Sequence, residues 1–196
     1  MKNAKYVIIA IACVCVICTG FYFFSQKNQV DEKNLTEIEK VMVKDLEKNY
    51  PKTPREVVKL YNSIVKCYYG KEVPTEKQLE DLVDQMLCIL DDDLLLQNER
   101  EDYYKQVVSD INQYKINKKQ LVSTDVCDTN DVKYVTDDKN NGEEKDELAY
   151  VDASYFLNTD GKFVYTYQRF ILRQDEDGRW KILTFYQIEG DQSDDK

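Results

Sequence analysis

The chain has 196 residues, with 27 Lys and Arg against 37 Asp and Glu, and a formal net charge of −10. This acidity disfavours nucleic acid as a partner, because phosphate binding requires clustered Lys and Arg. His is absent, which excludes Ser-His-Asp and Cys-His catalysis and the usual zinc sites, so we predict no metal and no cofactor.

The N-terminal segment is apolar: residues 6–24 carry no charge. A helix of this length spans about 28 Å, close to the hydrocarbon thickness of a bilayer. Lys2 and Lys5 precede it and the charges after it are mixed, which places the N-terminus in the cytoplasm. We predict a cytoplasmic end at 1–5, a single-pass signal-anchor at 6–24 in the lipid bilayer, and an extracellular C-terminal part.

Two alternatives remain for this segment. Cleavage as a signal peptide would secrete the protein, and Cys18-Thr19-Gly20 is the small-residue triplet that a peptidase would need. Four aromatic residues follow Gly20 at once, which favours a retained anchor. A lipoprotein is disfavoured because Cys18 follows Val16-Ile17 rather than a small residue, and Cys13 follows only seven apolar residues.

Residues 25–52 are predicted to form a juxtamembrane linker with an amphipathic helix over 34–48. Apolar residues recur there at helical spacing, and Asn34 with Glu37 resembles a capping pair. This helix either packs on the domain or lies against lipid.

A domain over residues 53–189 follows. Helices are predicted over 53–70, 75–90 and 100–114, the first two opening with Thr at the N-cap and Glu or Gln three residues later. In the last helix, the residues expected to face inward are Tyr104, Val107, Val108 and Ile111.

After the helices, the spacing of apolar residues changes from a helical period to the alternation of every second residue that is typical of strands. Short strands are predicted over 121–126 and 132–136, and longer strands over 148–157, 162–173 and 179–188. Asp160-Gly161 and Asp177-Gly178 separate the last three strands, as tight hairpins require. The charged stretch 137–147 does not match a calcium loop and is predicted to be a solvated connection, and 190–196 a disordered acidic tail.

Helices followed by a meander predict an α+β fold, with about three helices packed on a curved antiparallel sheet. Alternation places one aromatic-rich face of that sheet against the helices. The residues predicted to share it are Ala149, Val151, Ala153, Tyr155 and Leu157, then Phe163, Tyr165, Tyr167 and Ile171, then Trp180, Ile182 and Tyr186.

Three cysteines lie in the predicted domain. Cys67 and Cys88 fall within apolar helical patterns, which indicates buried free thiols; the alternative is a bridge between packed helices. Cys127 would then be unpaired. The run Asp91-Asp92-Asp93 indicates a helix end and an N-cap rather than a metal cluster, since hard cations need carboxylates that converge from several positions.

The helix TPREVVKLYNSIVKCYYG and the hairpin YTYQRFILRQDEDGRWKILTFYQI resemble the NTF2-like, cystatin-like cone fold. The phrases KDLEKNYPKTPREVVKLYN and DGRWKIL also resemble a domain-of-unknown-function family of membrane-anchored proteins from anaerobic Gram-positive bacteria. That family assigns no catalytic residue. Cone folds often hold a pocket between sheet and helices, and isomerases and dehydratases of this fold place Tyr and Asp in it.

The pocket candidates are therefore Tyr61, Tyr155, Tyr165 and Tyr186. Asp152 is a possible base, but alternation places it on the face opposite Tyr155. We expect a non-enzymatic binding or assembly module, with an envelope protein or a second copy as its partner. The alternative is a small-ligand carrier or an isomerase-like or dehydratase-like enzyme that uses the cone pocket.

Overall fold

The computed structural model describes residues 35–138 and 145–190. The predicted signal-anchor at 6–24 lies outside these residues, as does the tail from 191 onward. Among the described residues, no helix has both the length and the apolar character needed to cross a bilayer. The chain divides into a segment up to Leu35 and a compact unit from Thr36 onward, and the description below concerns that second unit.

The helices come first in this unit. They are α2 (Glu37–Met42), α3 (Pro54–Tyr69), α4 (Glu76–Leu87), α5 (Asp92–Leu95) and α6 (Arg100–Ile116). The predicted helices over 53–70, 75–90 and 100–114 are thus confirmed as α3, α4 and α6.

Local sequence sets where these helices begin. Thr53 and Thr75 each accept a hydrogen bond from the backbone three residues on, and the side chains at those positions, Glu56 and Gln78, return to the cap backbone. Pro54 fills the first turn of α3, where an N–H would have no helical partner. Within α6, Val107 and Ile111 are buried as predicted, and Tyr104 and Val108 are half-buried.

The amphipathic helix is shorter than predicted. It is capped by Thr36 with Glu39, rather than by Asn34 with Glu37, and it ends at Met42. Ile38 and Val41 are buried and α2 packs on α3 and α4, so its apolar face is covered by the domain.

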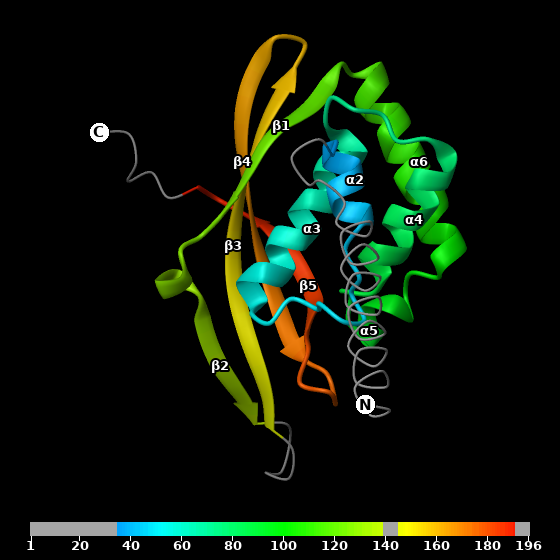
Figure 1. Cartoon of the computed structure of the whole chain (residues 1–196). Coiled ribbons are helices and arrows are strands. Elements are labelled where there is room, and N and C mark those ends of the chain that lie inside the picture. The colour runs from blue at the N-terminus through cyan, green and yellow to red at the C-terminus, as the bar shows by residue number, and fades with distance from the viewer. Residues whose placement is uncertain (1–34, 139–144, 191–196) are drawn as a thin grey trace, which may run out of the picture. The chain divides into compact units, whose positions relative to one another are not determined.

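The strands form one antiparallel sheet. They are β1 (Lys119–Val126), β2 (Lys133–Asp138), β3 (Lys145–Thr159), β4 (Lys162–Gln174) and β5 (Trp180–Ile188). The order is β1-β3-β4-β5, and β2 pairs with the part of β3 that β1 leaves uncovered. Figure 1 shows long, curved β3 and β4 with the helices gathered on one side of them. The α+β fold with a curved open sheet is confirmed.

The two predicted hairpins also form. Asp160 and Gly161 both have positive φ, 50° and 84°, as the tight β3–β4 turn requires. Gly178 has a φ of 73° in the β4–β5 turn, which Asp175 closes by accepting from the Gly178 N–H.

The predicted inward face of β3 is confirmed, but that of β4 is wrong. The five predicted β3 residues are buried, whereas Phe163 and Tyr165 of β4 are 58% and 59% exposed. Register explains the difference: Tyr155 pairs with Thr166, so the even-numbered residues of β4 face the helices, and Phe170 and Leu172 are buried. Because β4 carries aromatic residues on both faces, alternation alone could not show which of the two faces is buried.

A bulge changes the face of β5 partway along. Leu172 pairs with Ile182 and Ile171 pairs with Thr184, which leaves Leu183 as the extra residue. Trp180 and Ile182 therefore face the helices as predicted, but Tyr186 is turned to the opposite face and is 46% exposed.

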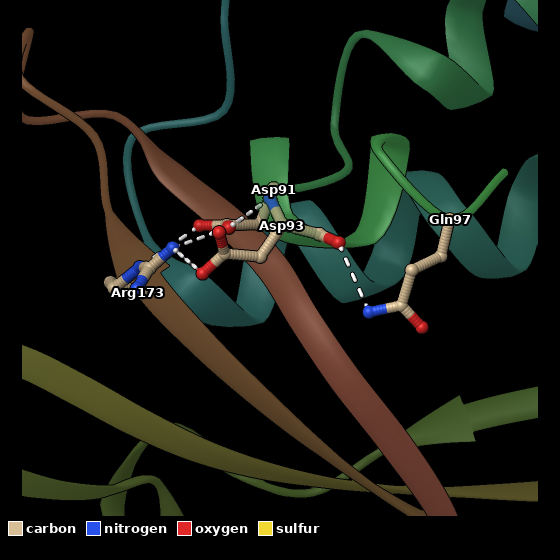
Figure 2. A network of polar contacts seen from close by, with 4 residues as sticks. All are labelled: Asp91, Asp93, Gln97 and Arg173. Atoms are coloured by element: carbon tan, nitrogen blue, oxygen red, sulfur yellow. Dashed lines mark hydrogen bonds and ion pairs between the residues drawn. The ribbon is translucent and has the colours of Figure 1, made fainter. Parts of the chain in front are cut away.

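A charged junction ties α5 to the sheet (Figure 2). Asp91 is buried and caps α5, accepting from the Asp93 N–H, which confirms the predicted N-cap. Arg173 of β4 reaches both Asp91 oxygens, at 2.6 and 3.1 Å, and Asp93 at 2.7 Å. These contacts, Asp91 first, raise the pKa of Arg173. Among the described residues no group of acidic side chains could hold a metal ion.

The three cysteines within the described residues, Cys67, Cys88 and Cys127, are free thiols. Cys67 is buried, as predicted, and burial raises its pKa to about 12. Cys88 is exposed rather than buried, because it ends α4 as the C-cap residue. The alternative bridge between Cys67 and Cys88 does not form.

Candidate functional site

A pocket of about 290 Å³ lies between α3, α6 and the inner face of the sheet. Its walls combine aromatic, aliphatic and polar side chains. They are Tyr61, Val65, Tyr68, Tyr69, Tyr103, Tyr114, Lys119, Leu121, Tyr155, Leu157, Thr166, Gln168 and Gln187. Gln187 is exposed, and Lys119, Thr166 and Gln168 are half-buried, so the pocket opens to solvent on their side.

Six tyrosines dominate the lining, and helical spacing brings them together. Tyr61, Tyr68 and Tyr69 lie seven and eight residues apart on α3, which places them on one face of that helix. Tyr103 and Tyr114 are separated by three turns of α6 and share a face in the same way. Tyr155 comes from the inward-facing set of β3.

The inner end of the pocket contains buried polar groups. The Tyr155 hydroxyl donates to Asn62 Oδ1 at 2.7 Å, and Asn62 is 2% exposed. Among the described residues, neither Asn62 Nδ2 nor the buried Tyr68 hydroxyl has a hydrogen-bond partner. Buried polar groups are normally satisfied, so these two require an explanation.

The outer part of the pocket is an aromatic stack that ends in a cation. The Tyr69 and Tyr114 rings stack with centroids 4.2 Å apart, and Lys119 Nζ lies 4.8 Å from the Tyr114 centroid. Lys119 is the one charged residue among the lining side chains named above. Tyr61 closes the other side, its ring 5.0 Å from Phe170 and 5.6 Å from Phe185.

Burial keeps these phenols protonated. It raises the pKa of Tyr61, Tyr68, Tyr69 and Tyr155 above the ordinary value, and the pKa of Tyr103 to about 12. Asp110 adds to the shift at Tyr103 and Tyr69. At neutral pH the lining tyrosines are therefore neutral hydroxyls, which can donate and accept hydrogen bonds but are not available as phenolate bases.

The structure brings together two of the four predicted pocket residues. Tyr61 and Tyr155 line the pocket, whereas Tyr165 and Tyr186 lie on the opposite face of the sheet. Asp152 also lies on that outer face, as alternation predicted, and forms two 2.7 Å hydrogen bonds with Arg169.

Sequence reasoning had not assigned Tyr69, Tyr103, Tyr114 or Lys119 to a site. Part of the site could have been found from the sequence, because the eleven residues that separate Tyr103 from Tyr114 place both tyrosines on one face of a helix. Which face meets the sheet depends on how α6 packs, and this is not encoded in local periodicity.

The chain was compared with known families and structures. The profile described as "Domain of unknown function (DUF6715)" matches residues 1–185. No curated protein sequence matches the chain. A crystal structure of the intermembrane space region of chloroplast protein ARC6 is similar at 12% identity and a TM-score of 0.35, covering 71% of this chain and 100% of that one.

Proposed function

We propose that this chain, which belongs to the DUF6715 family, is a membrane-anchored, extracytoplasmic and non-enzymatic binding module. The family match covers residues 1–185 and so includes the apolar segment 6–24. The tyrosine-lined pocket is the observation that carries this proposal. A family of unknown function supplies no activity, so the argument rests on the chemistry of the lining residues.

The pocket has the composition of a ligand site. Its volume of about 290 Å³ is at the small end of the range for small-molecule sites, and its walls combine aromatic rings with a few polar groups. Tyr68 and Asn62 hold unpartnered polar atoms beside it, which a ligand or its water shell would satisfy.

The donor set favours binding over proton abstraction. A general base must lie within hydrogen-bond reach of the proton it removes. The lining side chains are phenols, amides, Thr166 and one Lys, and the phenols are held in the protonated form. Asp152, the carboxylate that was considered as a possible base, is engaged by Arg169 on the other face. A carrier or sensor of a small ligand therefore fits better than an isomerase or dehydratase.

The proposed fold family is the NTF2-like cone. A curved sheet with α3 packed on β1, β3 and β5, and a pocket between sheet and helices, supports it. An experimental structure tests this assignment, because a cone requires the sheet to close around α3 at the pocket end.

The proposed anchor rests on the uncharged segment 6–24 and the preceding Lys2 and Lys5. Fractionation of cells that express the full chain should leave it in the membrane after a high-salt wash, with an intact N-terminus by Edman sequencing. Recovery of a shortened chain from the medium would instead indicate a secreted protein.

The outer face of the sheet supports a second role, docking to an envelope protein or to another copy. Phe156, Phe163 and Tyr165 form a continuous group there, with ring centroids 5.2 and 4.6 Å apart, and the last two are exposed. Contiguous exposed apolar patches can mark interaction sites when they are large, and this group is the candidate for one. Tyr165→Lys should abolish any self-association seen by analytical ultracentrifugation of the full chain in detergent.

The pocket role is tested by filling the pocket. Thr166→Trp places a large ring at the open side, and Tyr165→Trp adds a comparable ring on the adjacent, outward-facing residue as a control. Native mass spectrometry of full chain purified in mild detergent should show a small molecule bound to the wild type and to Tyr165→Trp. The same mass retained by Thr166→Trp would contradict binding in this pocket.

A further inference from the structure

We infer that the ligand of the tyrosine-lined pocket is a small carboxylate with a flat apolar body, held by Lys119 and by the phenol donors. This inference rests on the proposed function, because it names the class of ligand that the same pocket takes. Three properties of the pocket lead to it: a single lining charge, apolar walls with stacked rings, and a small volume.

Two buried polar groups near the pocket lack a partner among the described residues. Asn62 uses its carbonyl oxygen to accept from Tyr155, so the group left without a partner is its NH₂, a donor. The hydroxyl of Tyr68, which lines the pocket, is also unpartnered and buried. The amide NH₂ requires an acceptor such as a carbonyl oxygen or a bridging water, whereas the hydroxyl can pair with a donor or an acceptor.

The charge of the lining favours an anion. Lys119 lines the pocket and makes no ion pair with any described residue; its recorded contact is with the Tyr114 ring. A half-buried ammonium without a counter-ion is free to pair with a ligand carboxylate, and charge-assisted hydrogen bonds are roughly twice as strong as neutral ones.

One nearby carboxylate, that of Asp110, disfavours an anionic ligand. Asp110 raises the pKa of Tyr69, Tyr103 and Tyr114, so its charge is felt at the outer part of the pocket. It does not line the pocket, however, and it accepts a hydrogen bond from Gln106 Nε2 at 3.2 Å. A cation would have to settle beside Lys119, so the anion is favoured.

The body of the ligand follows from the walls. The stacked pair Tyr69 and Tyr114 and the aliphatic Val65, Leu121 and Leu157 form apolar surfaces suited to a ring. The volume of about 290 Å³ limits the ligand to a small molecule. An aromatic monocarboxylate with its carboxylate at the Lys119 end meets the requirements of charge, wall chemistry and volume.

The test uses the full chain in non-ionic detergent and three probes of one shape and different charge: benzoate, benzamide and benzyltrimethylammonium. Binding is measured by isothermal titration calorimetry to wild type, Lys119→Gln and Lys133→Gln. Lys133 is an exposed residue of β2 outside the pocket, so its variant matches the change in net charge. Trp180 fluorescence and thermal melting confirm that each variant is folded.

Benzoate should bind most tightly of the three. Lys119→Gln should weaken benzoate about tenfold, the loss of one hydrogen bond to a charged group, while Lys133→Gln leaves it within about twofold. Benzamide should respond equally little to both substitutions, because it carries no charge for Lys119 to pair with.

Equal affinity for benzoate and benzamide, or no effect of Lys119→Gln, would overturn the carboxylate inference. If benzoate and benzamide bind the wild type equally well but do not bind Thr166→Trp, the pocket is still a binding site, and only the carboxylate inference fails. If benzyltrimethylammonium binds most tightly, the carboxylate inference is overturned, and the ligand class becomes a cation held in an aromatic cage. Failure of all three probes to bind would count against both the inference and the pocket as a binding site.

Discussion

Replacement of Arg173 by Met should destabilise the fold strongly, because it leaves a buried carboxylate without its partner. The side chain of Asp91 is 5% exposed and that of Arg173 is 19% exposed. Arg173 contacts both oxygens of Asp91 and also Asp93 (Figure 2). Met keeps most of the apolar volume, so the change isolates the charge.

The expected size follows from the burial. Removal of one partner from a buried ion pair costs about 3–5 kcal/mol, and the partial exposure of Arg173 places this case near the lower end, about 3 kcal/mol. The pair Arg169–Asp152 is the control: Arg169 lies on the same strand as Arg173 and also contacts both oxygens of its carboxylate, but the two side chains are 31% and 39% exposed. Arg169→Met should cost less than about 1 kcal/mol.

Equilibrium urea unfolding of the full chain in non-ionic detergent measures both values. Trp180 is the single tryptophan and is buried, so its fluorescence reports loss of the packed sheet. In the double variant Arg173→Met with Asp91→Asn, the amide keeps the cap of α5 and removes the buried charge. It should recover about half of the loss or more. Equal costs for Arg173→Met and Arg169→Met, or simple additivity in the double variant, would refute the reasoning.

Three further predictions concern packing and buried acids. Thiol reagents at pH 8 should label Cys88 at once and Cys67 only after unfolding, because burial raises the pKa of Cys67 to about 12; equal labelling rates would be the contrary result. Ile38→Ala should cost about 2–5 kcal/mol in urea unfolding and Val43→Ala less than about 0.5 kcal/mol, since Ile38 is buried and Val43 is 47% exposed. The free energy of unfolding should fall as pH rises from about 9 toward about 12. Burial raises the folded-state pKa values of Cys67 and Tyr103 above their ordinary values, so folding favours the neutral forms, and this contribution is lost once the groups ionise. A free energy of unfolding that stays constant over this range would contradict the prediction.

The sequence was sufficient for most of the elements. Thr53 and Thr75 with their capping partners gave the helix starts, and Asp160-Gly161 and Asp177-Gly178 gave the hairpins. These features depend on neighbours within four residues, so a single sequence contains the whole signal.

The faces of β4 and β5 could not be obtained in the same way. In β4 the aromatic residues lie on both faces, and pairing of Tyr155 with Thr166 decides which face is buried. In β5 the bulge at Leu183 reverses the alternation, so Phe185 turns inward and Tyr186 outward. A bulge depends on the geometry of the partner strand and leaves no fixed mark in the sequence.

The candidate site was predictable in kind but not in membership. Tyrosines between sheet and helices were expected, and Tyr61 and Tyr155 are found there. Lys119 was not anticipated, because its position at the pocket depends on the packing of α6 against β1. The buried pair Asp91–Arg173 was missed for a similar reason, since its members are 82 residues apart.

The most direct test of the account is a crystal structure of the protein grown with benzoate. The account predicts electron density for one benzoate among Tyr61, Tyr103 and Tyr114, with its carboxylate within hydrogen-bond distance of Lys119 Nζ. It would be contradicted by a pocket that holds no ligand at saturating benzoate, with the tyrosine rings collapsed across the space between α3, α6 and the sheet.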